Sequence, residues 1–185
     1  MKIKFLISFL CFSLCFVSNS QNQEPIIHWN DSLKLSWNNF KDQPNPNTDV
    51  VAITASGMTF QYSIKKTDDR ITGFTTQVQT IFYPEKSWFK PERANNHILS
   101  HEQLHFDITE LHTRKFRQQI TAIEISENLV DNLDSLHLQI QKDLKNMQNL
   151  YDTETDFSRK IEAQANWQKQ IAIELSNLSE FKSSN

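Results

Sequence analysis

The chain contains no glycine or proline after Pro91, so its second half lacks the two residues that most often end a helix. Over this stretch apolar residues recur at spacings of three and four, which is the period of an amphipathic helix. The clearest series is Leu129, Leu133, Leu136, Ile140, Leu144, Met147 and Tyr151. Another helix can begin at a cap formed by Asn95 or Asn96, and a third can follow segment 152–158. Residues 95–181 are therefore predicted to form a helical hairpin or bundle.

The first half has the pattern of strands. Residues 58–64, "MTFQYSI", and 71–83, "ITGFTTQVQTIFY", alternate between apolar and polar side chains, and the polar segment "KKTDDR" separates them. This arrangement predicts an antiparallel hairpin within a β-rich part, residues 26–91. We expect an α+β fold, in which a small antiparallel sheet is followed by the helices.

The first 20 residues have the pattern of a secretory signal peptide. Lys2 and Lys4 precede a short apolar run, and Ser18 and Ser20 occupy the −3 and −1 positions of a cleavage site. The run is too short for a helix that crosses a bilayer. We expect an exported protein that lies in the periplasm or outside the cell.

The expected mature chain, residues 21–185, forms one domain and has no cysteine. Cys11 and Cys15 both lie in the leader and both follow a leucine, which argues against a lipid anchor. Setting Lys2 and Lys4 aside from the 19 basic residues leaves 17 against 22 acidic residues, a net charge of −5. No basic run could follow a phosphate backbone, and no later apolar run reaches the ~20 residues of a membrane span. We therefore expect no nucleic-acid partner and no membrane span.

The segment "HEQLH", residues 101–105, lies in the first predicted helix. His101 and His105 are one turn apart, so both imidazoles can bind one Zn²⁺ at about 2.0 to 2.1 Å. Glu102 points about 100° further round the helix, where it can act as a general base on a water molecule at the metal. The pattern predicts metal-assisted hydrolysis of a carbonyl compound.

The alternative is that both histidines are ordinary core residues with hydrogen-bond partners. On a helical wheel His101 and His105 lie on the same side as Ile98, Ile108 and Phe116, so both face inward. Burying two imidazoles without partners is costly, and a bound metal removes that cost. We therefore favour the metal site.

The third ligand is not fixed by the motif, and two candidates follow it on the same helix. Glu124 lies 18 residues beyond His105, about 28 Å along a straight helix at 1.5 Å per residue. His112 has the right direction but lies about 10 Å beyond His105. Glu124 becomes the ligand only if the chain turns back soon after the motif.

Other candidates come from the next helix if it returns antiparallel to the first. In that arrangement residue 103 lies opposite residue 151, which brings "YDTETD" to the metal. Asp152 and Asp156 are then the leading third ligands, and Tyr151 can donate a hydrogen bond to a developing oxyanion. Capping of the helix end is the competing role for these polar residues.

Two acidic residues just past the motif, Asp107 and Glu110, could orient a ligand histidine through its free ring N–H. We expect Glu110 to be a solvated surface charge and leave both roles open for Asp107.

These residues resemble a bacterial family of exported proteins, catalogued as domain of unknown function 922, for which a zinc-dependent protease activity is inferred. The resembling segments are "LSWNNF" (35–40), "AITASG" (52–57), "SW" (87–88), "HEQLHFDITE" (101–110), "YDTET" (151–155) and "QANW" (164–167). The resemblance implies that His101 and His105 are metal ligands and that Glu102 is catalytic. Many members have a histidine where this chain has Phe157, a departure that makes Asp152 the preferred third ligand and puts catalytic competence in question.

The leading functional hypothesis is a secreted or periplasmic zinc-dependent peptidase with a zincin-like fold. Its substrate would be a peptide or protein, and the predicted strand over 73–83 could offer a free edge to an extended chain. The alternative is a non-catalytic metal-binding or envelope-associated interaction module on the same scaffold. Retention of metal with loss of hydrolysis in a Glu102→Gln variant would favour the enzyme.

Overall fold

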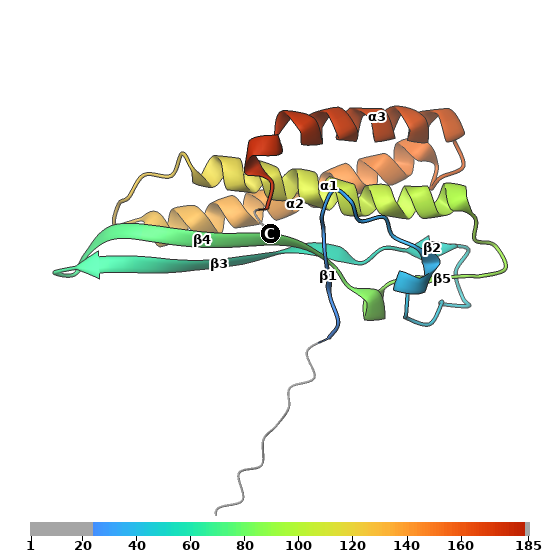
Figure 1. Ribbon diagram of the computed structural model, residues 1–185, viewed down its shortest axis with the longest axis horizontal. Helices are drawn as coiled ribbons and strands as arrows, with labels where there is room; N and C mark the ends of the chain where they lie inside the picture. The colour runs from blue at the N-terminus through green and yellow to red at the C-terminus, as the bar shows by residue number, and fades with distance from the viewer. Residues whose placement is uncertain (1–23, 184–185) are drawn as a thin grey trace, which may run out of the picture.

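The computed structural model describes residues 24–183, so the expected signal peptide and its cleavage site lie outside the described residues. The fold is α+β, with a small antiparallel sheet and three helices, as the sequence predicts. Figure 1 shows the long β3–β4 hairpin along one side of the helices α1 and α2, with α3 on their other side. Within the described part of the chain, no helix is long and apolar enough to span a membrane.

The sheet is dominated by one hairpin. Strands β3 (Ser56–Thr67) and β4 (Arg70–Phe82) pair antiparallel along their whole length, and the chain reverses through left-handed residues Asp68 and Asp69. The short strand β1 (Ile27–His28) pairs with the end of β4, which gives the order β1-β4-β3. The predicted hairpin is confirmed. Among the described residues no strand pairs with the outer edge of β3, and β1 covers the outer edge of β4 only at Ile81 and Phe82.

A second, two-stranded sheet joins β2 (Ala52–Ile53) to β5 (Trp88–Phe89). Because β2 is followed almost at once by β3, the backbone from residue 51 to residue 67 forms one extended segment beside α1. Two hydrogen bonds tie this segment to the helix. The Thr54 hydroxyl donates to the Glu102 carbonyl at 3.2 Å, and the hydroxyls of Ser56 and Thr109 are 2.7 Å apart.

The three predicted helices are present as α1 (Asn96–Ile120), α2 (Leu129–Thr155) and α3 (Ile161–Asn177). Asn95 caps α1 as expected, since its side chain accepts a hydrogen bond from the Ile98 amide at 3.0 Å. Short 3₁₀ turns lie at Trp37–Asn39, Pro84–Lys86 and Ser179–Phe181. Helix α2 continues through Thr155, into the segment 152–158 that was expected to precede the third helix, and Ile161 at the start of α3 is exposed.

Helices α1 and α2 are antiparallel neighbours, and their register is visible in three contacts. His101 meets Asp152, His105 meets Gln148, and the rings of Phe116 and His137 stack with centroids 5.5 Å apart. A given number of residues forward along α1 corresponds to the same number of residues backward along α2, as expected for two antiparallel helices of equal rise. The last turn of α2 is therefore brought beside the "HEQLH" turn of α1.

Apolar side chains fill both faces of this helix pair. The inward face of the hairpin packs against the C-terminal half of α1 and the N-terminal half of α2 around Phe116, Leu129, Leu133 and Ile140. On the other side, Leu104, Ile108, Leu111, Tyr151, Trp167 and Ile171 join α1, α2 and α3. These two clusters hold the helix pair between sheet and α3, and so fix the position of the motif.

His112 lies in this helical interior, two turns beyond the motif. It is 3% exposed, and neither ring nitrogen has a hydrogen-bond partner among the described residues. Burial lowers the pKa of His112 to about 4, with Lys115 contributing in the same direction and Asp143 and Glu174 opposing it. The protein therefore keeps this imidazole neutral at ordinary pH.

A His112→Leu variant should lose less stability in acid than the wild type. The imidazole of an unfolded chain protonates near pH 6.5 and that of the folded protein only near pH 4. The wild type therefore loses free energy of unfolding, relative to the variant, as pH falls below 6.5, and this pH-dependent loss is absent above pH 6.5. By pH 4 it should reach up to about 3 kcal/mol. Urea unfolding at pH 7.5, 5.5 and 4.0 measures it. The exposed His28, changed to Gln, should keep the wild-type pH dependence, and an unchanged slope in His112→Leu would contradict the assignment.

Candidate metal centre

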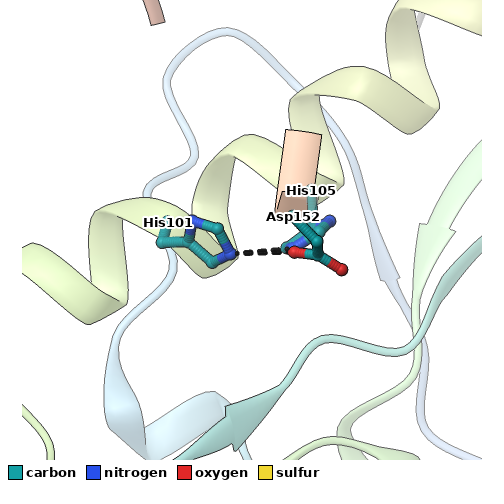
Figure 2. Close-up of side chains that lie close together, drawn as sticks. All are labelled: His101, His105 and Asp152. Carbon is teal, nitrogen blue, oxygen red and sulfur yellow. Dashed lines mark hydrogen bonds and ion pairs between the residues drawn. The ribbon is translucent and has the colours of Figure 1, made fainter. Parts of the chain in front are cut away.

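Three side chains from two helices converge at one point (Figure 2). His101 and His105 come from α1 and Asp152 from α2, and one potential ligand atom from each lies within 4.8 Å of the others. The two histidine Nε2 atoms are 3.1 Å apart, and Asp152 Oδ1 lies 3.1 Å from Nε2 of His101 and 2.9 Å from Nε2 of His105. A group with this composition and geometry could hold a metal ion.

These separations match the demands of tetrahedral coordination. Ligand atoms about 2.0 to 2.1 Å from a tetrahedral zinc ion are about 3.3 Å from one another. The three distances in the cluster are 3.1, 3.1 and 2.9 Å. Little movement would therefore be needed for the three atoms to bind one ion, and a fourth position would remain open.

The side chain of Gln148 decides which nitrogen of His105 carries a proton. Its Oε1 atom contacts Nδ1 of His105, and because an amide oxygen only accepts, Nδ1 must donate. In the neutral ring, Nε2 of His105 then presents a lone pair to Asp152 and His101. This nitrogen and Asp152 Oδ1 are two lone-pair atoms 2.9 Å apart, and they repel each other unless a cation, which can be a proton or a metal ion, lies between them. This arrangement is the strongest indication of cation binding at the site.

The pKa values of Asp152 and His105 are shifted in opposite directions, each toward the charged form of its group. Burial alone would raise the pKa of the Asp152 carboxyl, but hydrogen bonds from His101 and His105 outweigh it and hold this pKa well below its usual range. Burial alone would lower the pKa of His105, but the hydrogen bond to Asp152 and the charge of Glu102 outweigh it and raise this pKa. The carboxylate and the imidazole thus stabilise each other's charged forms.

Glu102 lies on α1 beside His101 and is 5% exposed. Its carboxylate has no hydrogen-bond partner within residues 24–183, although its backbone carbonyl accepts from Thr54. The side chain lines a cleft of about 1120 Å³ whose floor also includes His101, His105 and Asp152. The rest of the lining comes from the extended segment 48–58, α2, the turn 157–159, Arg93 and Ile98. A buried carboxylate without a partner among these residues therefore lines the same cleft as the three potential ligands.

The structure also separates the third-ligand candidates. Asp152 is in the cluster, whereas Asp156 caps α2 and forms an ion pair with Arg159 at 2.9 Å. Glu124 follows the end of α1 at Ile120, about 22 Å or more along the helix from His105, and is exposed. His112 is packed among the three helices and makes no contact with the motif histidines. The antiparallel return of α2 explains why Asp152 alone of these four reaches the site.

Tyr151 occupies a different place from the one expected. Its ring stacks on His101 with centroids 4.4 Å apart, its exposed fraction is 0%, and it does not line the cleft. Burial raises the pKa of its hydroxyl, and the charges of Glu102 and Asp152 raise it further. Tyr151 packs against both histidine rings on the side away from the cleft, a position that does not favour the predicted hydrogen bond to an oxyanion.

The two acidic residues beyond the motif do not contact a motif histidine. Asp107 accepts hydrogen bonds from the Trp29 ring nitrogen at 2.8 Å and from Gln103 at 2.9 Å. The expectation that Glu110 is a surface charge is wrong: it is 1% exposed and accepts from Arg114 at 2.8 Å. Both carboxylates instead fix α1 to neighbouring parts of the fold.

The residue that orients His105, Gln148, was not anticipated from sequence. An amide is not among the usual zinc ligands, so a search for histidine, cysteine and carboxylate does not find it. Its spacing could have indicated this role, because Gln148 precedes Asp152 by four residues and so lies on the same face of α2.

Replacing Gln148 by Leu should weaken metal binding about 10- to 100-fold, since His105 would lose the partner that fixes its tautomer and ring orientation. Gln148→Glu should largely restore affinity, because a carboxylate also accepts from Nδ1. Competition between the protein and a chelating dye for Zn²⁺ or Co²⁺ measures the metal affinity. Gln141→Leu, a change on the cleft-facing side of the same helix, is the matched control and should bind as the wild type does. Equal affinity in Gln148→Leu and wild type would refute the role.

Comparison with known protein families identifies a match. The sequence profile described as "Bacterial protein of unknown function (DUF922)" matches residues 30–159, a range that contains both strands of the hairpin, α1, α2 and every residue of the cluster. No curated protein and no solved structure matches the chain. Because the matched range covers well over half of the sequence, the chain belongs to the DUF922 family of bacterial proteins of unknown function.

Proposed function

We propose that the protein is an exported zinc-dependent peptidase with a zincin-like active site on α1. The observation that carries the proposal is the placement of Glu102, whose buried and unpartnered carboxylate lies beside the three-donor cluster at the floor of a large cleft. A site that only stored a metal ion would have no need of a buried free carboxylate in the same cleft. The leader-like residues 1–20 support export.

Zinc is the ion proposed because the donors are two imidazoles and one carboxylate in a partly buried site that lines the cleft. This set is that of catalytic zinc centres, which combine three protein ligands with one exchangeable position. When bound, zinc would supply a Lewis acid that polarises a peptide carbonyl and increases the acidity of water.

The remaining steps belong to the chain's own residues. Glu102 accepts the proton of the attacking water at its carboxylate and later delivers it to the amine that leaves. Gln148 keeps His105 in the tautomer whose Nε2 faces the site, and the Tyr151 ring restricts the rotation of His101. These contacts hold the donors in place before substrate arrives, which reduces the reorganisation that the reaction requires.

The substrate proposed is a peptide in extended conformation. Segment 51–58, which includes β2 and the start of β3, lines the cleft, and neither strand has a further strand on its outer edge within the described residues. An unpaired edge can hydrogen-bond to the backbone of an extended chain. This edge is preferred to the one predicted over 73–83 because it lines the cleft, whereas the strand over 73–83 does not.

The metal assignment is tested by three alanine variants of the mature protein. His101→Ala should abolish binding of one equivalent of zinc, and Asp152→Ala should lower zinc affinity because one of the three donors is removed. Asp156→Ala removes a nearby carboxylate outside the cluster and should leave stoichiometry and affinity unchanged. Native mass spectrometry with elemental analysis gives the result. Full zinc binding by His101→Ala would eliminate the site.

The catalytic assignment is tested by Glu102→Gln, which keeps the shape of the side chain but cannot take up the proton of water. Zinc content should match that of wild type, while hydrolysis of a peptide library should fall by about 10² to 10⁴. The digest is repeated with a chelator, which should stop cleavage by the wild type. Metal binding without any wild-type cleavage would favour the non-catalytic metal-binding module, and equal turnover by the variant would exclude Glu102 as the base.

A further inference from the structure

The turn between α2 and α3 contains three consecutive residues in the left-handed region, none of them glycine. The φ angles of Asp156, Phe157 and Ser158 are 48°, 51° and 72°. Such a conformation costs on the order of 1 to 2 kcal/mol for each residue with a side chain, and a bulky aromatic residue is rare there. Strained backbone of this kind persists only when its surroundings hold it, and it is concentrated at functional sites.

The surroundings hold this turn firmly. The Phe157 amide donates to the Asp152 carbonyl at 2.8 Å, and the Lys160 amide donates to the Thr155 carbonyl at 2.9 Å. From α1, Nε2 of His97 donates to the Ser158 carbonyl at 2.6 Å. The turn is thus anchored to the candidate ligand Asp152 and to the helix turn that precedes His101.

Core packing does not account for the strained aromatic residue. The side chain of Phe157 is 58% exposed and lines the cleft. Two other exposed apolar residues, Val50 and Ile53, each 41% exposed, come from the extended segment and line the same cleft. Single exposed apolar residues are ordinary on protein surfaces, but three that line one cleft beside a candidate metal centre indicate a surface that binds apolar groups.

We propose that Phe157 is a specificity-determining residue, and that the cleft selects extended peptides with a large apolar side chain close to the bond that is cleaved. This inference rests on the proposed peptidase function and names its substrate class. The strained turn presents the ring at the cleft five residues after Asp152, so that a substrate side chain packed against it lies near the metal centre. Contact with the ring removes apolar surface of both partners from water and so favours large apolar side chains.

The variant that separates this role from a structural one is Phe157→Asn. Asparagine adopts the left-handed region more readily than phenylalanine, so the change should leave the melting temperature equal or higher. If Phe157 served packing, the same change would lower the melting temperature. The matched control is Asp69→Asn, which places asparagine at another left-handed position, in the β3–β4 turn outside the cleft lining.

Binding is measured in the zinc-loaded Glu102→Gln protein, so that peptides are not consumed. The probes are fluorescein-labelled, end-blocked alanine hexapeptides with Phe, Leu or Ser at one central position, followed by fluorescence anisotropy. The Phe and Leu peptides should bind at least about fivefold more tightly than the Ser peptide, within the discrimination that apolar contacts provide. Adding Phe157→Asn should reduce this preference to below about twofold, and adding Asp69→Asn should leave it intact.

A preference that survives Phe157→Asn, absence of any preference, or no binding of these peptides would overturn the inference. Hydrolysis of the same peptides by the wild type is followed in parallel. If the wild type cleaves none of them, the proposed peptidase function is wrong, while the affinity comparison still decides whether Phe157 reads apolar side chains. If the wild type cleaves them with a preference that Phe157→Asn does not change, the peptidase function stands and the inference fails.

Discussion

The contact between His105 and the α2 pair Gln148 and Asp152 is the interaction on which the candidate site depends. Gln148 fixes the proton on Nδ1, and Asp152 then meets the opposite nitrogen, so the ring is held from both ends. Because the two α2 residues are one turn apart, as are the two histidines of α1, antiparallel packing aligns both pairs at once. The hairpin on one side and α3 on the other serve this alignment by holding the two helices together.

The opposite side of α1 shows why this helix is a rigid support. Glu110 is buried among Arg114, Arg117 and Thr80, which lies on β4, while Asp107 receives the ring N–H of Trp29 from the N-terminal segment. Buried polar groups of this kind are costly unless their hydrogen bonds are satisfied, so they allow few alternative arrangements. The helix that carries the motif is therefore fixed to the sheet and the N-terminal segment by directional contacts as well as by apolar packing.

The parts of this structure that follow a period could be predicted from sequence. Alternation located the hairpin, spacings of three and four located the helices, and equal rise in an antiparallel pair brought Asp152 rather than Glu124 to the histidines. The parts that depend on tertiary partners could not be predicted. Nothing near Glu110 in the sequence reveals that Thr80 will meet it. The left-handed turn at 156–158 contains none of the glycines by which such turns are normally recognised.

The register between α1 and α2 has a consequence for how this chain can vary in length. The loop that joins them, residues 121–128, lies at the end remote from the candidate metal site, and an insertion there need not disturb packing that is already fixed on both sides. One extra residue inside α2, between Leu129 and Gln148, would instead turn every later side chain by about 100° and carry Asp152 away from the histidines. Seven extra residues, about two full turns, would restore the direction of these side chains but move them about 10 Å along the helix. Homologues should therefore differ freely in the loop and almost never within the helix.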